Sequence, residues 1–403
     1  MSIQTSFPPW IPSEIVDGYE EKSLSSLFEW QAHLISIKNT RNLVFCAPTS
    51  AGKSLVAEVL GLRVALKGKR VLFVFPYIAV AKEKLSFIQK LWRRVDIQVA
   101  GYIGPSSAPT REWTAAVCTF EKANSLVSHA ICDKSLHEYG MVIIDELHMV
   151  LDQSRGPTLE ALLAKLNYYN STNTSDNWIE IVGMSATLPK VQQIGEWLQA
   201  QVYETDFRPV GLQQCYSTDG VVYDVEGRRE IRRLNARFRY PGDLDCTIGF
   251  CVESVLARKP TLVFCSSKAE VERVAMDVAR IMDQELKEGG NEDFLVQGQL
   301  FELKTMLEMS CKQLDTSLAK TLPRGVAYHH AGLTAEEREC VEKAFRERTI
   351  FALVATSTLS SGVNLPAALV IIKAQIRGPA SLNSMSYRQM SGRAGRMGFV
   401  EHG

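Results

Sequence analysis

One segment of the sequence has the residue types of a phosphate-binding loop. Residues 47–54, APTSAGKS, lie between an apolar run at 43–46 and a helix-like stretch at 55–66. Such a loop needs backbone N–H groups that wrap anionic oxygens, a helix N-terminus aimed at them, a lysine for the terminal phosphates and a hydroxyl for Mg²⁺. Here Gly52 allows the close approach, Lys53 supplies the charge and Ser54 supplies the hydroxyl. The segment therefore predicts nucleotide binding.

The first position of this loop departs from the usual pattern. A strict phosphate-binding loop begins with glycine, and this chain has Ala47 instead. Taken alone, the segment leaves open a chance loop between a strand and a helix. We expect the nucleotide to meet the consecutive residues Ala47, Pro48, Thr49, Ser50, Ala51, Gly52, Lys53 and Ser54.

A pair of carboxylates follows a second apolar run. Residues 141–144, Met-Val-Ile-Ile, are continuously apolar, as in a strand buried on both faces, and they end in Asp145-Glu146-Leu147-His148. Parallel α/β sheets place their ligands at the carboxyl ends of strands. We expect Asp145 to hold Mg²⁺ opposite Ser54, and Glu146 to orient and deprotonate an attacking water. The alternative is a solvated acidic turn. The presence of the phosphate-binding loop upstream, at 47–54, makes this alternative less favoured.

Composition limits the class of protein. The 403 residues allow two or three domains, and an apolar fraction of 46% suffices for their cores. Lys+Arg and Asp+Glu number 45 each, so no net positive charge points to nucleic acid. Local grooves and backbone amides can still bind phosphates without net charge.

Cysteine usage and the N-terminus indicate the compartment. The nine cysteines form no C-x-x-C pair and several lie in apolar runs, so we expect buried thiols in a reducing compartment, not zinc ligands or disulfides. The chain does not begin with a signal-peptide pattern, and no apolar run is long enough to span a bilayer. We expect a soluble, intracellular protein with no membrane partner.

Apolar runs alternate with helical patterns along the first half of the chain. A helix is predicted at 79–93 and a polar surface loop at 167–177. Strands are predicted at 43–46, 71–75, 115–118, 141–144 and 181–184. This alternation is typical of a parallel α/β layer.

The alternation restarts in the second half. Residues 203–246, with mixed charges, Gly and Pro, predict a linker and a β-rich edge, and 285–293 predicts a flexible insertion. The expected elements are a strand at 261–265, a helix at 268–282 and strands at 351–355 and 369–372. The fold class is therefore α/β, built twice along the chain.

The second half lacks a phosphate loop but ends in a pair of arginines. Arg393 and Arg396 are separated by small residues, which suits a compact turn that presents guanidinium groups to anions. An arginine delivered to a γ-phosphate stabilises the transition state, and from another domain it makes hydrolysis depend on domain closure. A basic surface loop is the alternative for any isolated R-A-G-R.

Taken in order, these segments resemble the motifs of the superfamily-two helicases. The set is Gln31, APTSAGKS, PYIAVAKEK (76–84), CTFEKAN (118–124), DELH (145–148), SATL (185–188), LVFCSSK (262–268), HHAGL (329–333), ATSTLSSGVNLP (355–366) and QMSGRAGR (389–396). Within the superfamily, DELH with HHAGL and GVNLPA resembles the group that contains the helicase domain of DNA polymerase theta and the archaeal-type repair helicases. The resemblance covers about residues 27–398.

The resemblance implies two tandem RecA-like domains with parallel sheets. The expected parts are an N-terminal segment (1–24), an ATP-binding domain (25–205), a linker with a β-rich edge (206–246) and a truncated helicase C-terminal domain (247–403). Members of the group continue with winged-helix and ratchet domains, which we expect to be absent from this chain. We therefore expect this chain alone to unwind duplexes poorly.

The resemblance also assigns roles to residues around ATP. Gln31 would contact the adenine. Gly362, Gln389, Arg393 and Arg396 would face ATP from the second domain, with both arginines sensing the γ-phosphate. His148, Ser185 and Thr187 would couple the nucleotide state to strand movement; otherwise they are ordinary polar residues of turns.

Nucleic-acid contacts follow from the same resemblance. A groove across both domains would be lined by Pro76, Thr119, Ser266 and Thr356, whose hydroxyls and amides would hold phosphates without reading bases. Each of these is otherwise a plain residue at a strand end. His329 and His330 have no further ligand at metal-binding spacing, so we expect contacts with an interface or with the strand.

The resemblance implies an ATP- and Mg²⁺-dependent DNA helicase moving 3′ to 5′ on single-stranded DNA. Its expected substrates are single strands and duplex junctions, and its expected setting is the nucleus and double-strand-break repair by end joining. Two alternatives stay open: an RNA helicase of the superkiller type, and a nucleic-acid-binding scaffold with weak motor activity. A metabolic kinase leaves the motifs of the second half unexplained. The sequence does not give the oligomeric state.

Overall fold

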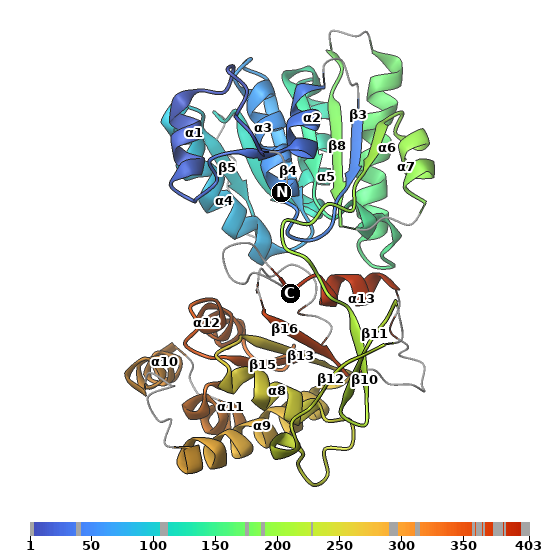
Figure 1. Ribbon diagram of the computed structural model, residues 1–403. Coiled ribbons are helices and arrows are strands. Elements are labelled where there is room, and N and C mark those ends of the chain that lie inside the picture. The colour runs from blue at the N-terminus through green and yellow to red at the C-terminus, as the bar shows by residue number, and fades with distance from the viewer. Residues whose placement is uncertain are drawn as a thin grey trace. The chain divides into compact units, whose positions relative to one another are not determined.

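The computed structural model describes most of the chain as two compact units, Met1–Phe207 and Arg208–Gly403 (Figure 1). The described residues are 4–37, 42–104, 112–173, 177–186, 190–226, 229–289, 297–310, 315–356, 359, 365, 367–373, 382 and 384–395. Each unit is built around its own parallel sheet, and in this respect the α/β expectation is confirmed.

The first unit contains a seven-stranded sheet in the order β5-β6-β4-β7-β8-β3-β9, with every neighbouring pair parallel. The five predicted strands are present, and the sequence missed the two edge strands because they are short and hold Gly or polar residues. The strands are β3 (Asn42–Cys46), β4 (Arg70–Phe75), β5 (Val99–Tyr102), β6 (Ala115–Thr119), β7 (Tyr139–Ile144), β8 (Glu180–Ser185) and β9 (Gln201–Glu204).

Alternating side chains of these strands pack into two separate cores. In β3, Leu43 and Phe45 join one core, and Val44 joins the other, because successive residues of a strand point to opposite faces. The first core includes α1 (Ser13–Glu20), α2 (Glu29–Ser36), α3 (Lys53–Ala65) and α4 (Ile78–Trp92). The second includes α5 (Phe120–Cys132), α6 (Gly156–Thr172) and α7 (Val191–Trp197). A small antiparallel pair, β1 (Gln4–Thr5) with β2 (Leu27–Phe28), completes the unit.

The second unit holds a four-stranded parallel sheet in the order β14-β15-β13-β16. Its strands are β13 (Thr261–Cys265), β14 (Val326–His329), β15 (Ala352–Thr356) and β16 (Leu369–Ile372). Its helices are α8 (Thr247–Leu256), α9 (Lys268–Gly289), α10 (Gln297–Ser310), α11 (Thr316–Thr321), α12 (Ala335–Arg346) and α13 (Ser384–Ser391).

A separate antiparallel sheet precedes this core. It consists of β10 (Cys215–Thr218), β11 (Val221–Asp224) and β12 (Glu230–Arg233). Val222 packs against the small cluster of Leu234, Cys246 and Phe250. The sheet lies within 206–246, the segment in which the sequence suggested a linker and a β-rich edge.

Two predicted loops are helical, and the physical reason is tertiary. Residues 167–172, predicted as surface loop, continue α6, because the buried Asn170 amide bonds both the N–H and the C=O of Ile179. Residues 285–289, predicted as a flexible insertion, continue α9, where Glu285 accepts from Tyr240 and pairs with Arg237. Residues 290–293 lie outside the described residues.

The expectation of buried thiols holds for some of the cysteines only. Cys46, Cys118, Cys246, Cys251 and Cys265 are buried, but Cys132 and Cys215 are exposed, so the expectation is wrong for these two. Cys132 lies on the last turn of α5, and Cys215 lies in the open sheet β10–β12. Within the described part of the chain, no helix has the length and apolar character needed to cross a membrane.

Candidate nucleotide and nucleic-acid sites

The phosphate-type loop connects β3 to α3 through a left-handed glycine. Gly52 has φ +89°, a conformation that residues with a Cβ rarely adopt, and a Cβ there would lie 2.4 Å from Gln31 Nε2. Ala47 is buried, its N–H donates to the carbonyl of Ser185 at 3.1 Å, and it is not among the described residues with positive φ. The first position of this loop therefore does not require the glycine of the strict pattern.

Lys53 lies at the first turn of α3 and folds back over its own loop. Its ammonium donates to the carbonyl oxygens of Ala47 at 2.8 Å and Pro48 at 3.0 Å. The two carbonyls thus keep the charge at the helix N-terminus, where the partial positive charge of the helix also favours an anion. The loop has the charge and the backbone geometry to bind phosphate.

Gln31 is held directly against this loop. Its side chain is buried, accepts from the Phe28 N–H at 2.9 Å and donates to the Gly52 carbonyl at 3.0 Å. The structure therefore places Gln31 beside the phosphate-type loop. There its side chain holds the backbone at the left-handed Gly52. Its contact with adenine stays a prediction.

The acid pair lies at the carboxyl end of β7, a central strand between β4 and β8. Asp145 Oδ1 accepts from the Glu146 N–H at 2.9 Å, and Glu146 has φ +53°. Burial and the adjacent Glu146 charge raise the pKa of the Asp145 carboxyl, while the nearby Lys53 and Lys84 oppose the rise. The fold therefore brings the predicted acid within electrostatic reach of the predicted lysine.

This acid pair fits a divalent cation. Two adjacent carboxylates repel each other in a buried place, and hard oxygen ligands are those that Mg²⁺ prefers. Ser54, the expected hydroxyl ligand, lies at the second position of α3, next to Lys53. These residue types are suited to Mg²⁺, and the site they would form stays a prediction.

A histidine connects the acid pair to the neighbouring strand. His148 lies in the short 3₁₀ helix Leu147–Leu151, with its Nδ1 3.2 Å from Glu146 Oε2 and 2.9 Å from Ser185 Oγ. His148 and Ser185 are both buried. Two of the three residues predicted to couple nucleotide state to strand movement thus contact each other; the third, Thr187, lies outside the described residues.

Pro76 and Thr119 lie at the same carboxyl edge of the first sheet. Phe75 and Thr119 are register partners, and Pro76 directly follows β4. The Pro76 carbonyl accepts from the guanidinium of Arg155, a residue that sequence reasoning did not select. Thr119 is buried at the start of α5, so its hydroxyl is less open to a ligand than a strand-end position suggests.

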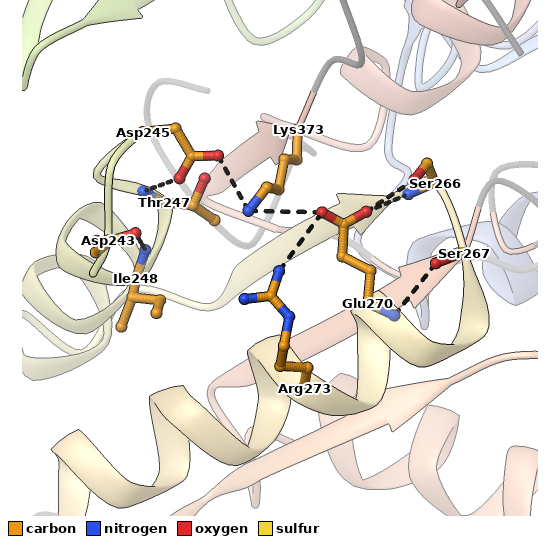
Figure 2. A network of polar contacts seen from close by, with 9 residues as sticks. All are labelled: Asp243, Asp245, Thr247, Ile248, Ser266, Ser267, Glu270, Arg273 and Lys373. Atoms are coloured by element: carbon orange, nitrogen blue, oxygen red, sulfur yellow. Dashed lines mark hydrogen bonds and ion pairs between the residues drawn. The ribbon is translucent and has the colours of Figure 1, made fainter. Parts of the chain in front are cut away.

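Ser266 and Thr356 are brought together at the carboxyl edge of the second sheet. Cys265 and Thr356 are register partners, and Ser266 follows Cys265. The N–H and Oγ of Ser266 both donate to Glu270 Oε2, at 3.1 and 2.8 Å (Figure 2). The backbone near Ser266 is therefore held by the first turn of α9.

A chain of ion pairs extends from Glu270 across this edge (Figure 2). The Lys373 ammonium, just past β16, lies 3.5 Å from Glu270 and 3.0 Å from Asp245. Asp243 in turn accepts from the N–H groups of Ile248 and Gly249 at the start of α8. Sequence reasoning did not select Glu270 or Lys373, because the two residues are far apart along the chain.

His329 and His330 bond to carboxylates of two helices. His329 Nε2 lies 2.8 Å from Glu342 Oε1 on α12, and His330 Nε2 lies 2.9 Å from Glu272 Oε1 on α9. Both imidazoles are buried. The HHAGL segment therefore joins β14 to its covering helices.

The arginine-bearing segment at the C-terminal side is described up to Gly395. Gln389 lies in α13, and Arg393 is buried, with its carbonyl accepting from the Ala367 N–H at 3.0 Å. Gly395 N–H donates to the Ala367 carbonyl at 3.1 Å. Gly362 and Arg396, the other residues predicted to face ATP, lie outside the described residues.

Two helicase families match the two units. The family of DEAD/DEAH box helicases matches residues 29–194, and the helicase conserved C-terminal domain matches residues 278–398. These matches contain the lysine loop, the acid pair and the arginine-bearing segment. The chain belongs to the superfamily-two helicases, with two RecA-like α/β domains.

Curated relatives specify the branch of that superfamily. The chain is 44% identical to DNA polymerase theta of Caenorhabditis elegans, over 98% of this chain and 24% of the relative. It is 35% identical to the human Helicase POLQ-like protein, over 96% of this chain and 36% of the relative. It is 31% identical to the ATP-dependent DNA helicase Hel308 of Pyrobaculum calidifontis, over 98% and 54%. The chain thus spans a quarter to about half of the length of these relatives.

Proposed function

We propose that the chain is an ATP-hydrolysing DNA helicase or translocase of the polymerase theta type. The observation that carries this proposal is that Lys53, after β3, and the Asp145–Glu146 pair, after β7, lie at the carboxyl edge of the first sheet within electrostatic reach of each other. The relatives named for DNA synthesis or DNA unwinding support DNA as the nucleic acid.

Each residue of the first unit would have its own role in ATP hydrolysis. Ser54 and Asp145 would hold Mg²⁺, which would neutralise the phosphates that Lys53 binds. Glu146 would orient the attacking water and take its proton, and His148, 3.2 Å from Glu146 Oε2, would hold that carboxylate in place. Gln31 would contact adenine from its position beside Gly52.

The second unit would complete the site by closing on ATP. Gly362, Gln389, Arg393 and Arg396 would face the γ-phosphate, so hydrolysis would depend on domain closure. Pro76, Thr119, Ser266 and Thr356 would hold the strand by its phosphates, so that alternating closure moves the chain 3′ to 5′. His148, Ser185 and Thr187 would transmit the nucleotide state. The setting that we propose is the nucleus, in end joining of double-strand breaks.

The test is steady-state ATP turnover without nucleic acid, with single-stranded DNA and with single-stranded RNA. Strong stimulation by DNA, lost in Lys53→Ala, is the expected result. Stimulation by RNA alone would identify a superkiller-type RNA helicase instead. Binding without stimulation by either would identify a nucleic-acid-binding scaffold.

A further inference from the structure

Glu58 is a buried acid that the proposed mechanism does not use. It lies on α3, five residues after Lys53, and its side chain is 5% exposed. A buried carboxylate without partners is costly, so its partners indicate its role. Lys84 Nζ on α4 lies 2.9 Å from Glu58 Oε1, and the Tyr19 hydroxyl of α1 donates to Glu58 Oε2 at 3.2 Å.

These three residues join helices that begin at different sites. α3 begins at Lys53, inside the phosphate-type loop, and α4 begins at Ile78, just after Pro76 at the expected nucleic-acid edge. The Glu58–Lys84 ion pair therefore connects the helix of one site to the helix of the other. Tyr19 is almost fully buried and fixes the second oxygen of Glu58.

Lys84 also interacts electrostatically with Asp145, in addition to its ion pair with Glu58. The side chain of Lys84 is 23% exposed, so the ion pair is screened less than a surface pair.

We propose that Tyr19, Glu58 and Lys84 are positioning residues that transmit nucleic-acid binding at the start of α4 to the phosphate loop at the start of α3. This inference rests on the proposed function, since it concerns stimulation of ATP turnover by nucleic acid. The buried ion pair is the element that both helices share, so its loss uncouples them.

The test is the double variant Glu58→Gln with Lys84→Met. Removing Lys84 alone leaves a buried charge and lowers the melting temperature, whereas the double variant removes both charges and keeps an acceptor for the Tyr19 hydroxyl. Its matched control is Arg63→Met with Glu180→Gln, which removes the 3.5 Å ion pair between the same helix α3 and β8. A second control, Lys84→Arg, keeps the positive charge beside Glu58.

The measurements are basal ATP turnover, turnover at saturating single-stranded DNA, DNA affinity by fluorescence anisotropy, and melting temperature. We expect the double variant to melt near the wild type and to bind DNA, while the ratio of DNA-stimulated to basal turnover falls by about tenfold, an ordinary size for coupling between two sites. The control pair and Lys84→Arg should keep wild-type stimulation.

Two results would overturn the inference, and they can be told apart. If the wild type is stimulated and the double variant is stimulated equally, the ion pair is structural only and the proposed function stands. If no nucleic acid stimulates the wild type, the proposed function fails, and this inference fails with it because no coupling exists to transmit.

Discussion

The two units place charged residues at the same edge of the same kind of sheet, but with different charge partners. In the first unit, two adjacent carboxylates lie near Lys53, and burial and the Glu146 charge raise the pKa of Asp145. In the second unit, Lys373 pairs with Glu270 and with Asp245, whose side chain is 46% exposed. Adjacent like charges favour a bound cation, whereas the carboxylates beside Lys373 already have one, so we expect Mg²⁺ at this edge of the first unit and not of the second.

The largest effect is expected when the acid of the first unit is neutralised. Glu146→Gln removes the general base and keeps its shape, so ATP turnover should fall by about 10²–10⁴-fold while nucleotide affinity is retained. The measurements are single-turnover hydrolysis and binding of a fluorescent ATP analogue. Glu138→Gln is the control, because Glu138 precedes the opposite end of β7 and pairs with Arg70 near the surface. Turnover within threefold of the wild type would contradict the assignment of Glu146.

A smaller loss is expected from His148→Ala, which breaks the link from Glu146 to Ser185. His148 Nδ1 lies 3.2 Å from Glu146 Oε2, and losing a residue that orients a reacting group typically costs about 10- to 100-fold in activity, so turnover should fall by roughly that factor. His137→Ala is the control, since the exposed His137 imidazole lies 2.9 Å from the nearby Lys134 carbonyl, away from the acid pair in the sequence. Equal turnover in the two variants would remove His148 from the site.

Substituting two glycines with positive φ distinguishes an effect on the geometry of the phosphate-type loop from the general cost of backbone strain. Gly52→Ala and Gly68→Ala both place a Cβ in the left-handed region, at φ +89° and +75°, which costs about 1–2 kcal/mol. Only at Gly52 does the Cβ meet a neighbour, Gln31 Nε2, at 2.4 Å. Chemical denaturation should show a lower free energy of unfolding for both variants. Nucleotide affinity should fall in Gly52→Ala alone. Loss of affinity in both variants would mean that general destabilisation explains it.

The smallest effect is expected in the second unit. Lys373→Met removes ion pairs that are partly exposed, so the free energy of unfolding should fall by less than about 1 kcal/mol, and basal ATP turnover should stay at the wild-type value. Lys287→Met, which removes an exposed pair with Asp283 on α9, is the control. A loss of basal turnover in Lys373→Met alone would show that this edge also takes part in chemistry, and the contrast between the units would fail.

Local sequence predicted the parts of this protein whose chemistry is local. The loop 47–54 and the acid pair after 141–144 are contiguous segments, and alternating apolar runs define central strands that are buried on both faces. These segments therefore showed the α/β class, the lysine and the acids. Helix ends were less visible, since Asn170 and Glu285 keep α6 and α9 helical through partners elsewhere in the fold.

Tertiary structure alone decided which distant residues meet. The sequence placed no restraint on the pairs Glu58–Lys84 and Glu270–Lys373, because each joins separate elements across space. It also left the role of Gln31 incomplete, since the bond to the Gly52 carbonyl exists only after α2 packs beside the loop. The sequence by itself determined which groups can do chemistry. Packing determined which of them are buried, and burial strengthens the electrostatic interactions of a charged group and shifts its pKa.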